Sequence, residues 1–404
     1  MLPEVKKENQ ISISEKKPKV NSYYMVLAGR FKVAKYVAIC FLVAFLLTTV
    51  VLFRDEITVE NLRYLFKDLE MGENVNFSTS GSTISYDSDA QLDLALYKGD
   101  LVIAGSSYFY LCDLQGNRRM NEESSFSNPV VVTSDKYLLV YGLSEYTCTL
   151  YNTFSKLHTE VFDYPITGAA VSDDGMYAIV TRTAEYKSAV YLYNSSFKRI
   201  GSIYKDKYIM DVEFNRDSSE VLIASVYSKD GNYCSEIMNY VPFSETPSSK
   251  TEVVGSMALK VGYNDDGGYS VIYDDKIEFY DSEFVLRNTY TFPLNMVPIT
   301  TEISDKYTLL TYSENIVGNN MRVLVFDSSG ELILNADADG QPKKLRCYNK
   351  YVFVLLDGKV CKINISNGNI DYYDTARNAI DLLVVNENSV LVCYSDRTIR
   401  VTTD

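Results

Sequence analysis

The segment that begins at Asn335 comes nearest, in residue types and spacing, to a metal site. Asn335, Asp337 and Asp339 occupy positions 1, 3 and 5 of an EF-hand calcium loop, and a glycine follows at position 6. Positions 9 and 12 carry Lys343 and Arg346, although position 12 needs a bidentate glutamate. Two interpretations stay open: a weak calcium site, or a plain turn between strands.

The chain has few residues that could support histidine-based catalysis. His158 is the single histidine, and it lies between Lys156 and Glu160 in a predicted outer strand. A Ser-His-Asp triad needs a histidine with partners, and zinc sites generally need more than one. Carboxylates gather at Asp265–Gly268 and Asp274-Asp275, and paired carboxylates can cleave glycosidic bonds. Asp-Gly is also ordinary hairpin chemistry, so we expect no catalytic residue.

Cysteine and tyrosine offer two further kinds of chemistry. Cys347 and Cys361 fall on the first and third strands of one predicted unit, about 9.6 Å apart, whereas a disulfide needs Cα atoms within about 7 Å. We therefore expect buried free thiols. Tyrosine occurs 34 times, and exposed tyrosine favours interfaces. We expect partner contacts from four tyrosines on the loop faces, unless strand propensity explains the excess: Tyr108, Tyr186, Tyr233 and Tyr263.

The elements that would position these residues follow a repeat. Apolar bursts are separated by 37, 40, 44, 48, 38, 44 and 38 residues, and they are centred near Leu101, Leu138, Ala178, Leu222, Ser270, Thr308, Val352 and Val390. Several short strands per period of about 40 residues predict an all-β, eight-bladed β-propeller over residues 82–404. Seven blades is the alternative, if the long fourth unit hides an insertion or two units merge.

The last unit supplies only three strands, which would leave an open edge in the ring. Thr83–Asp87 precedes the first complete unit and has the composition of a strand. We predict that it pairs outside the last blade and closes the ring.

Residues 36–53 form an 18-residue run without charge, about 27 Å long as a helix and so sufficient for a membrane span. A signal peptide would have a shorter apolar core and a small-residue cleavage site. Residues 1–35 hold eight basic and three acidic residues, which predicts a cytoplasmic tail and a propeller outside the cytoplasmic membrane. Residues 54–81 would hold a juxtamembrane amphipathic helix, at 58–70, and a linker.

Charge restricts the partners. The chain beyond residue 35 carries 31 basic and 50 acidic residues, a net charge of −19 that excludes nucleic acid. The remaining partners are a cell-envelope protein or glycan, the bilayer through residues 36–53, and a second copy of the chain through residues 36–70.

Six predicted strands end in a hydrophobic residue followed by Asp or Asn: Cys112-Asp113, Tyr151-Asn152, Tyr193-Asn194, Tyr280-Asp281, Phe326-Asp327 and Ile363-Asn364. These pairs resemble the Trp-Asp endings of WD40 repeats, although the chain has no tryptophan. The blade count is similar to that of quinoprotein dehydrogenases, but the residues for quinone and calcium are missing. The eight-bladed lipoprotein scaffold of outer-membrane assembly, which binds rather than catalyses, is the better analogue.

The whole layout resembles a family of single-pass, membrane-anchored propellers from Gram-positive anaerobes, a group without an assigned activity. The resemblance implies a fold and a location. We expect a non-catalytic binding or scaffold module for a cell-envelope partner, with no cofactor. The alternative is an extracytoplasmic glycan lyase or hydrolase. Convergence of carboxylates and tyrosines at the ring axis would favour the enzyme.

Overall fold

The structure is a computed structural model, and it describes residues 22–52, 83–293, 296–313 and 320–404. The chain divides into an N-terminal unit and a propeller unit, residues 77–404. The N-terminal unit contains one described helix, α1 (Ser22–Leu52). No helix within the described ranges combines the length and apolar character that a membrane span needs. The amphipathic helix predicted at 58–70 lies outside the described residues.

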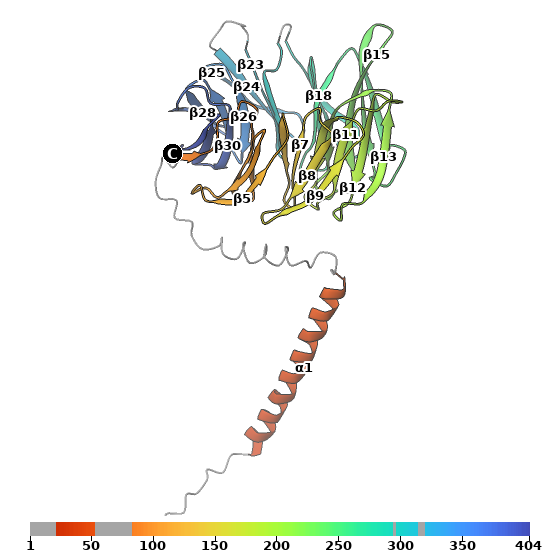
Figure 1. Ribbon diagram of the computed structural model, residues 1–404, viewed down its shortest axis with the longest axis vertical. Coiled ribbons are helices and arrows are strands. Elements are labelled where there is room, and N and C mark those ends of the chain that lie inside the picture. The colour runs from red at the N-terminus through yellow and green to blue at the C-terminus, as the bar shows by residue number, and fades with distance from the viewer. Residues whose placement is uncertain (1–21, 53–82, 294–295, 314–319) are drawn as a thin grey trace, which may run out of the picture. The chain divides into compact units, whose positions relative to one another are not determined.

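The described strands of the propeller form eight antiparallel sheets of four strands each, so the prediction of eight blades is confirmed (Figure 1). Blade 1 contains β2 (Asp93–Tyr97), β3 (Asp100–Ala104), β4 (Tyr108–Cys112) and β5 (Arg118–Glu123). Blade 2 contains β6 (Pro129–Thr133), β7 (Leu138–Gly142), β8 (Thr147–Tyr151) and β9 (Lys156–Val161). Blade 3 contains β10 (Ile166–Val171), β11 (Tyr177–Thr181), β12 (Ser188–Tyr193) and β13 (Arg199–Lys205). Blade 4 contains β14 (Tyr208–Phe214), β15 (Val221–Lys229), β16 (Asn232–Tyr240) and β17 (Ser249–Val254).

The second half of the ring repeats this order. Blade 5 contains β18 (Ala258–Tyr263), β19 (Tyr269–Tyr273), β20 (Lys276–Tyr280) and β21 (Leu286–Thr291). Blade 6 contains β22 (Thr300–Ile303), β23 (Tyr307–Tyr312), β24 (Asn320–Asp327) and β25 (Leu332–Asp339). Blade 7 contains β26 (Lys344–Tyr348), β27 (Tyr351–Leu356), β28 (Lys359–Asn364) and β29 (Ile370–Asp374). Blade 8 contains β30 (Asp381–Asn386), β31 (Ser389–Cys393), β32 (Arg397–Thr402) and β1 (Thr83–Ser85).

The first strand of each blade is the innermost one. First strands of neighbouring blades contact each other all the way round, from β2 through β30 and back to β2. Because the strands of a blade are antiparallel, the first and third strands end at the same face of the ring. We call this the AB face, after the turns that join first strands to second strands. The opposite face, which carries the turns from second to third strands, is the BC face.

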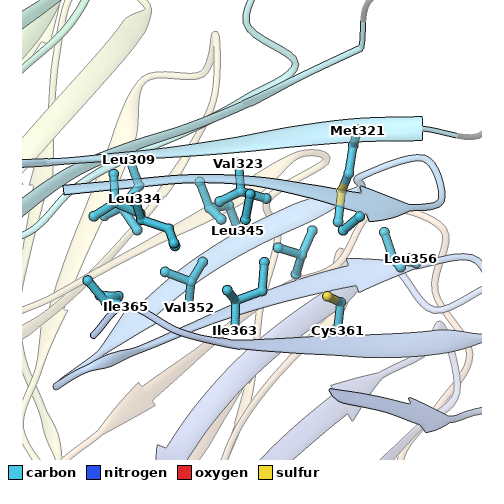
Figure 2. Close-up of a cluster of buried hydrophobic side chains, with 14 residues drawn as sticks. Leu309, Met321, Val323, Leu334, Leu345, Val352, Leu356, Cys361, Ile363 and Ile365 are labelled. Atoms are coloured by element: carbon cyan, nitrogen blue, oxygen red, sulfur yellow. The ribbon is translucent and has the colours of Figure 1, made fainter. Parts of the chain in front are cut away.

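The hydrophobic core lies between blades. Each of the eight buried clusters in the described propeller combines side chains from two adjacent blades. Figure 2 shows the cluster between blades 6 and 7, where Leu309, Met321 and Leu334 face Leu345, Val352 and Ile363. Second strands are almost fully buried, since both of their faces pack on neighbouring sheets. This explains why the strands show as continuous apolar bursts.

The Asp or Asn at the end of the third strand, present in six of the eight blades, caps a turn. The Asp281 carboxylate accepts the backbone N–H groups of Glu283 and Val285, both at 2.9 Å. The Asn194 side chain does the same for Ser196 and Lys198, both at 3.0 Å. Such side-chain caps hold the turn to the outer strand. The preceding aromatic takes the place of tryptophan: in blade 3 Tyr193 stacks on Tyr177 with ring centroids 4.6 Å apart.

The ring closes through β1, as the sequence predicted. Thr83 pairs with Ile399, Ile84 with Thr398 and Ser85 with Arg397, so β1 is the outermost strand of blade 8. The hydroxyl of Tyr86 donates a hydrogen bond of 2.7 Å to the carbonyl of Tyr394. A segment more than 300 residues away along the chain therefore covers the open edge of β32.

This seam leads to a stability prediction. Ile84 is buried in the cluster between blades 8 and 1, whereas the neighbouring Thr83 is exposed. Ile84→Ala should lower the free energy of unfolding by about 2–4 kcal/mol, because it leaves a cavity in a packed cluster. Thr83→Ala, on the same strand, should change it by less than about 0.5 kcal/mol. Urea unfolding of the full-length chain measures both, and equal effects of the two substitutions would contradict the role of Ile84.

Candidate functional site

Charged side chains gather on the inner strands around the ring axis. Four first strands carry carboxyl groups and two carry cations: Asp93 on β2, Asp211 and Glu213 on β14, Glu302 on β22, Asp381 on β30, Lys260 on β18, and Lys344 and Arg346 on β26. Acidic blades 4, 6 and 8 thus alternate with basic blades 5 and 7. Carboxylates thus converge toward the axis, which is one of the two conditions named for the enzyme alternative; the other is a convergence of tyrosines.

Three of these carboxyl groups connect one blade to the next. Asp93 accepts the backbone N–H of Val131 at 2.8 Å, and Asp211 accepts that of Val261 at 3.0 Å. Glu302 accepts the N–H of Cys347 at 3.1 Å. Each donor belongs to the first strand of the following blade, which has no sheet neighbour on the axial side. The carboxyl groups therefore satisfy edge N–H groups that no strand can pair.

Burial raises the pKa of all three carboxyl groups, and it does so against the opposing effect of these hydrogen bonds. Asp381 belongs to a different arrangement. Its carboxylate accepts the N–H of Leu382 at 2.7 Å and pairs with Arg346 at 3.4 Å and Lys344 at 3.9 Å. The axis therefore mixes hydrogen-bonded carboxyl groups with one ion-paired carboxylate between blades 7 and 8.

A cavity of about 470 Å³ lies at the AB face, where the first strands of blades 2 to 6 end. Its charged lining residues come from five blades: Asp135, Asp173, Glu213, Arg216, Lys260, Asp265 and Asp305. Tyr263 and Asn264 also line it. We call this space the axial cavity. Its volume lies within the range of small-ligand pockets.

The carboxyl group of Glu213, which lines the axial cavity, has a strongly raised pKa. The Glu213 side chain is exposed to the water of the axial cavity, and the walls of that cavity surround it with protein atoms. Burial, followed by the negative charges of Asp211, Asp173 and Asp305, raises the pKa of Glu213 to about 8, and Lys260 opposes the shift. This shift favours the protonated form of the Glu213 carboxyl group, which can donate a hydrogen bond or a proton.

The four tyrosines singled out from the sequence lie in different environments. Tyr186 and Tyr233 are exposed on the BC face, Tyr233 by 68%. The prediction that Tyr108 is exposed is wrong: it is 6% exposed, stacks on Tyr110 and donates its hydroxyl to the carbonyl of Asp87. Tyr263 is half-buried and donates to the side chain of Asn239 at 2.8 Å, although it also lines the axial cavity. The structure does not bring these four together.

The calcium-loop interpretation is also wrong, and so is the plain turn. Asn335, Asp337 and Asp339 lie on the outermost strand β25, with all three exposed. Alternate residues of a strand are about 6.8 Å apart and point to one side, so they cannot wrap around one ion. Asp337 instead forms an ion pair of 2.8 Å with Arg322 on the adjacent strand. No group of three or more potential acidic, histidine or cysteine ligands occurs anywhere in the described ranges.

The remaining candidates confirm most of the sequence interpretation. His158 lies on the outermost strand β9, contacts Glu160 at 2.9 Å and stacks on Phe197. The described cysteines are free thiols, and Cys347 and Cys361 do lie on the first and third strands of blade 7. The two acidic turns of blade 5 are separated by β19, so Asp265 reaches the axial cavity while Asp274 caps Met257 at the BC face.

Glu213, Asp173, Asp135 and Asp305 were not singled out from the sequence. A signal was present, because Asp135, Asp173, Asp265 and Asp305 each follow the first strand of a repeat unit at nearly the same position. Aligning the repeats on their first strands would have placed these carboxylates on one ring. Asp-Gly turn chemistry concealed that recurrence, since aspartate is common in such turns.

Comparison with known proteins identifies the class and then the family. Similar solved structures include BamB from Moraxella catarrhalis (TM-score 0.55, 13% identity, 80% of this chain and 99% of that one) and the C-terminal WD40 domain of Sif2 (0.58, 16%, 80% and 99%). Sqt1 from Chaetomium thermophilum, bound to the N-terminus of ribosomal protein L10, is similar as well (0.58, 11%, 80% and 100%). At these identities the likeness concerns the propeller fold. No curated protein matches.

A model of the family DUF5711, a family of unknown function, matches residues 73–402, so the chain belongs to this family. The match covers every blade and thus the whole axial cavity.

The raised pKa of Glu213 leads to a pH prediction. A carboxyl group that binds its proton more tightly when folded destabilises the fold progressively as the pH rises from its unfolded value of about 4.5 to its folded value of about 8. Glu213→Gln removes this penalty. The Tm of the variant minus that of the wild type should therefore increase from pH 5 to pH 8 and stay constant at higher pH. Thermal unfolding at pH 5, 7 and 9 measures the difference, with Glu331→Gln in an exposed turn as control. A pH-independent difference would contradict the raised pKa of Glu213.

Proposed function

We propose that this protein is a membrane-anchored, extracytoplasmic binding module that holds a cell-envelope partner on its propeller without catalysing a reaction. The axial cavity is the observation that carries this proposal. A rigid ring with a charged recess at one face suits recognition, because its residues are pre-organised before a ligand arrives. Sqt1, a propeller of similar fold, is bound to the terminus of another protein.

The composition of α1 supports the anchor. Residues 36–52 of the uncharged run belong to α1, where Phe41, Phe45 and Leu47 are exposed by 62–73%. Large apolar side chains are costly in water, and a bilayer would cover them. The hydroxyl of Thr48 donates to the carbonyl of Ala44 at 2.8 Å, which satisfies it within the helix, as a hydrocarbon environment requires. The basic residues 1–35 favour a cytoplasmic N-terminus, and pairing of two copies through residues 36–70 is part of the proposal.

A second candidate function, action on a glycan, is favoured by Glu213. Its raised pKa is what a general acid needs, and Asp173 and Asp305 lie close enough for their charges to contribute to the shift. Turnover of a cell-envelope glycan by the purified chain, lost in Glu213→Gln, would support it.

The anchor gives a direct prediction. Val43→Arg together with Leu47→Arg places two charges in the middle of the run, at a cost of about 2.5–3.5 kcal/mol each at the centre of a bilayer. We expect the wild type to stay in the membrane pellet after alkaline carbonate extraction and the double variant to be released. Phe31→Arg, on the same helix but outside the run, is the control. Release of the wild-type chain would contradict the anchor.

The binding function is tested by proximity labelling from the propeller in intact cells. A labelling enzyme fused to Asp404, which lies close to the seam, should mark one reproducible envelope partner. Co-purification with the full-length chain should recover the same partner. The control is a chain that consists of residues 1–82 fused to the labelling enzyme. The binding interpretation would be overturned if no partner is enriched over this control, or if the purified protein turns over a glycan.

A further inference from the structure

Two cations at one corner of the BC face, where blades 3 and 4 meet, have no acidic partner. Arg182 and Lys187 lie in the turn from β11 to β12. Their charged groups lie over the ring of Tyr208, with the guanidinium carbon 4.7 Å and the Nζ atom of Lys187 5.0 Å from the ring centroid. No carboxylate of the described residues forms an ion pair with either cation. Because two like charges beside one ring repel each other, an anion that contacts both would stabilise them.

Three further cations surround a single carboxylate at the same corner. Glu236 on β16 is 2% exposed, and the ammonium groups of Lys207 and Lys250 both contact its Oε2 atom. The ammonium group of Lys205 lies 3.8 Å from the Oε1 atom. Burial lowers the pKa of Lys205, Glu236 opposes this shift, and the charge of Lys250 adds to it. One carboxylate therefore faces three ammonium groups, which leaves positive charge in excess.

The two groups of cations form one continuous surface. The backbone N–H of Lys187 donates to the carbonyl of Lys205 at 3.0 Å, which joins the turn before β12 to the end of β13. Lys207 follows in the connection from β13 to β14, directly before Tyr208. This connection lies at the BC face, because the first strand of each blade begins there. We call this surface the basic corner, and its cations are Arg182, Lys187, Lys205, Lys207 and Lys250.

An excess of cations is unusual in this chain. Beyond residue 35 it carries 50 acidic and 31 basic residues, so acids are available to pair with every cation. Elsewhere in the ring, Lys276 pairs with Glu278, and Arg287 pairs with Asp266. At the basic corner, in contrast, five cations share one buried carboxylate. A positive region on an acidic protein attracts a negatively charged partner and orients it, because opposite potentials steer the encounter.

Exposed aromatic side chains lie beside these cations. Tyr186, Tyr204, Tyr208 and Met210 are each exposed by 40–46%. The rings of Tyr186 and Tyr204 are neighbours, with centroids 5.3 Å apart. Tyrosine, methionine and arginine are enriched at the cores of protein–protein interfaces, and tyrosine and arginine supply many of the residues that dominate binding energy. The composition of the basic corner and its tyrosines is therefore that of a protein-binding surface.

A sugar fits this surface less well. A sugar ring stacks on an open aromatic face, whereas the ring of Tyr208 already lies under Arg182 and Lys187. The ring of Tyr204 contacts two other tyrosine rings, at 5.3 Å and 6.3 Å between centroids. The tyrosines thus offer edges and partly covered faces. Side chains of a protein segment can pack against such edges, because aromatic and apolar groups pair in many orientations.

An anionic bilayer fits less well for a different reason. A plane of lipid headgroups would cover the BC face beyond the basic corner and meet the exposed carboxylates of Asp163, Asp230 and Asp275. These like charges would oppose the attraction that the cations provide. A protein segment can contact the basic corner alone, so it avoids these carboxylates.

We propose that the basic corner binds an acidic segment of a partner protein. Carboxylates of this segment pair with Arg182, with Lys187 and with the excess cations around Glu236. An apolar side chain of the segment packs on Tyr186 and Tyr204. The inference rests on the proposed binding function and deepens it, because it assigns a surface on the BC face to the partner and an acidic character to the partner's contact segment.

A charge-removing variant tests the surface with the partner recovered by proximity labelling. Arg182→Gln combined with Lys187→Gln removes two exposed charges that make no ion pair, so the propeller should fold as before. Recovery of the partner on the full-length chain should fall at least about tenfold. Lys156→Gln combined with Lys198→Gln, two exposed lysines at the AB face of blades 2 and 3, removes the same charge and should behave as wild type. Thermal unfolding checks that both variants are folded.

Matched probes test the chemistry without the natural partner. We expect a fluorescent peptide of Glu-Glu-Phe repeats to bind the purified full-length chain, and the same peptide with Gln for each Glu to bind at least about tenfold more weakly. The affinity of the acidic peptide should fall with added salt, since screening weakens exposed charge pairs. The variant with Arg182→Gln and Lys187→Gln should bind both peptides equally. Fluorescence anisotropy measures these affinities, and the variant with Lys156→Gln and Lys198→Gln is again the control.

The outcomes separate this surface from the proposed function. Equal binding of the two peptides, or full affinity in the folded variant with Arg182→Gln and Lys187→Gln, would overturn the basic corner. Tighter binding of polygalacturonate or of phosphatidylglycerol vesicles than of the acidic peptide would assign the surface to a glycan or a bilayer, against the proposal. A labelled partner that the variant still recovers would leave the proposed function intact and refute the surface. Corner-dependent peptide binding without any labelled partner would do the reverse.

Discussion

Every blade of this protein has two apolar faces, and this constraint organises the whole propeller. A sheet that is apolar on both sides needs a neighbour on each side, and a row of such sheets is satisfied only when it closes into a ring. The eight inter-blade clusters follow from it, as does the need for a strand that joins the two ends of the propeller. β1 supplies that strand, and Ile84 adds its side chain to the cluster across the seam.

Closure has a second consequence, at the axis. The innermost strand of each blade is paired on one side only, so its N–H groups on the axial side need acceptors in a narrow space. Asp93, Asp211 and Glu302 provide them by reaching from one blade to the next. Acidic side chains therefore have a structural role at three of the blade junctions, and the repulsion between them is relieved by cations or by protonation. The raised pKa of Glu213 reflects that crowding.

The axial cavity is an extension of this charged interior to the AB face. Below the mouth, carboxyl groups are occupied by backbone N–H groups or by Arg346 and Lys344. At the mouth, Asp135, Asp265 and Asp305 line the cavity together with Glu213. A ring that tolerates acids at its axis for structural reasons can present further acids at its mouth to a ligand.

Much of the fold could be predicted because it is repeated. The period of about 40 residues, the strand-length apolar bursts and the Asp or Asn after six of the third strands are local signals, each with a local cause in packing or in turn capping. The closure of the ring could also be predicted, since the last unit supplies three strands and a blade needs a fourth. This missing strand, together with the strand-like composition of Thr83–Asp87, identified the segment that closes the ring.

The axial cavity, in contrast, depended on the tertiary structure. Glu213 and Asp305 are about 90 residues apart along the chain, and only ring closure brings the ends of their strands to one recess. Likewise, whether Asn335, Asp337 and Asp339 form a loop or a strand was decided by pairing with β24, which no spacing rule reveals. Tyr108 is buried for the same reason, because its exposure is set by a neighbour from the opposite end of the propeller. Local sequence determined the blades and their number; long-range packing decided which side chains face water, each other or the axis.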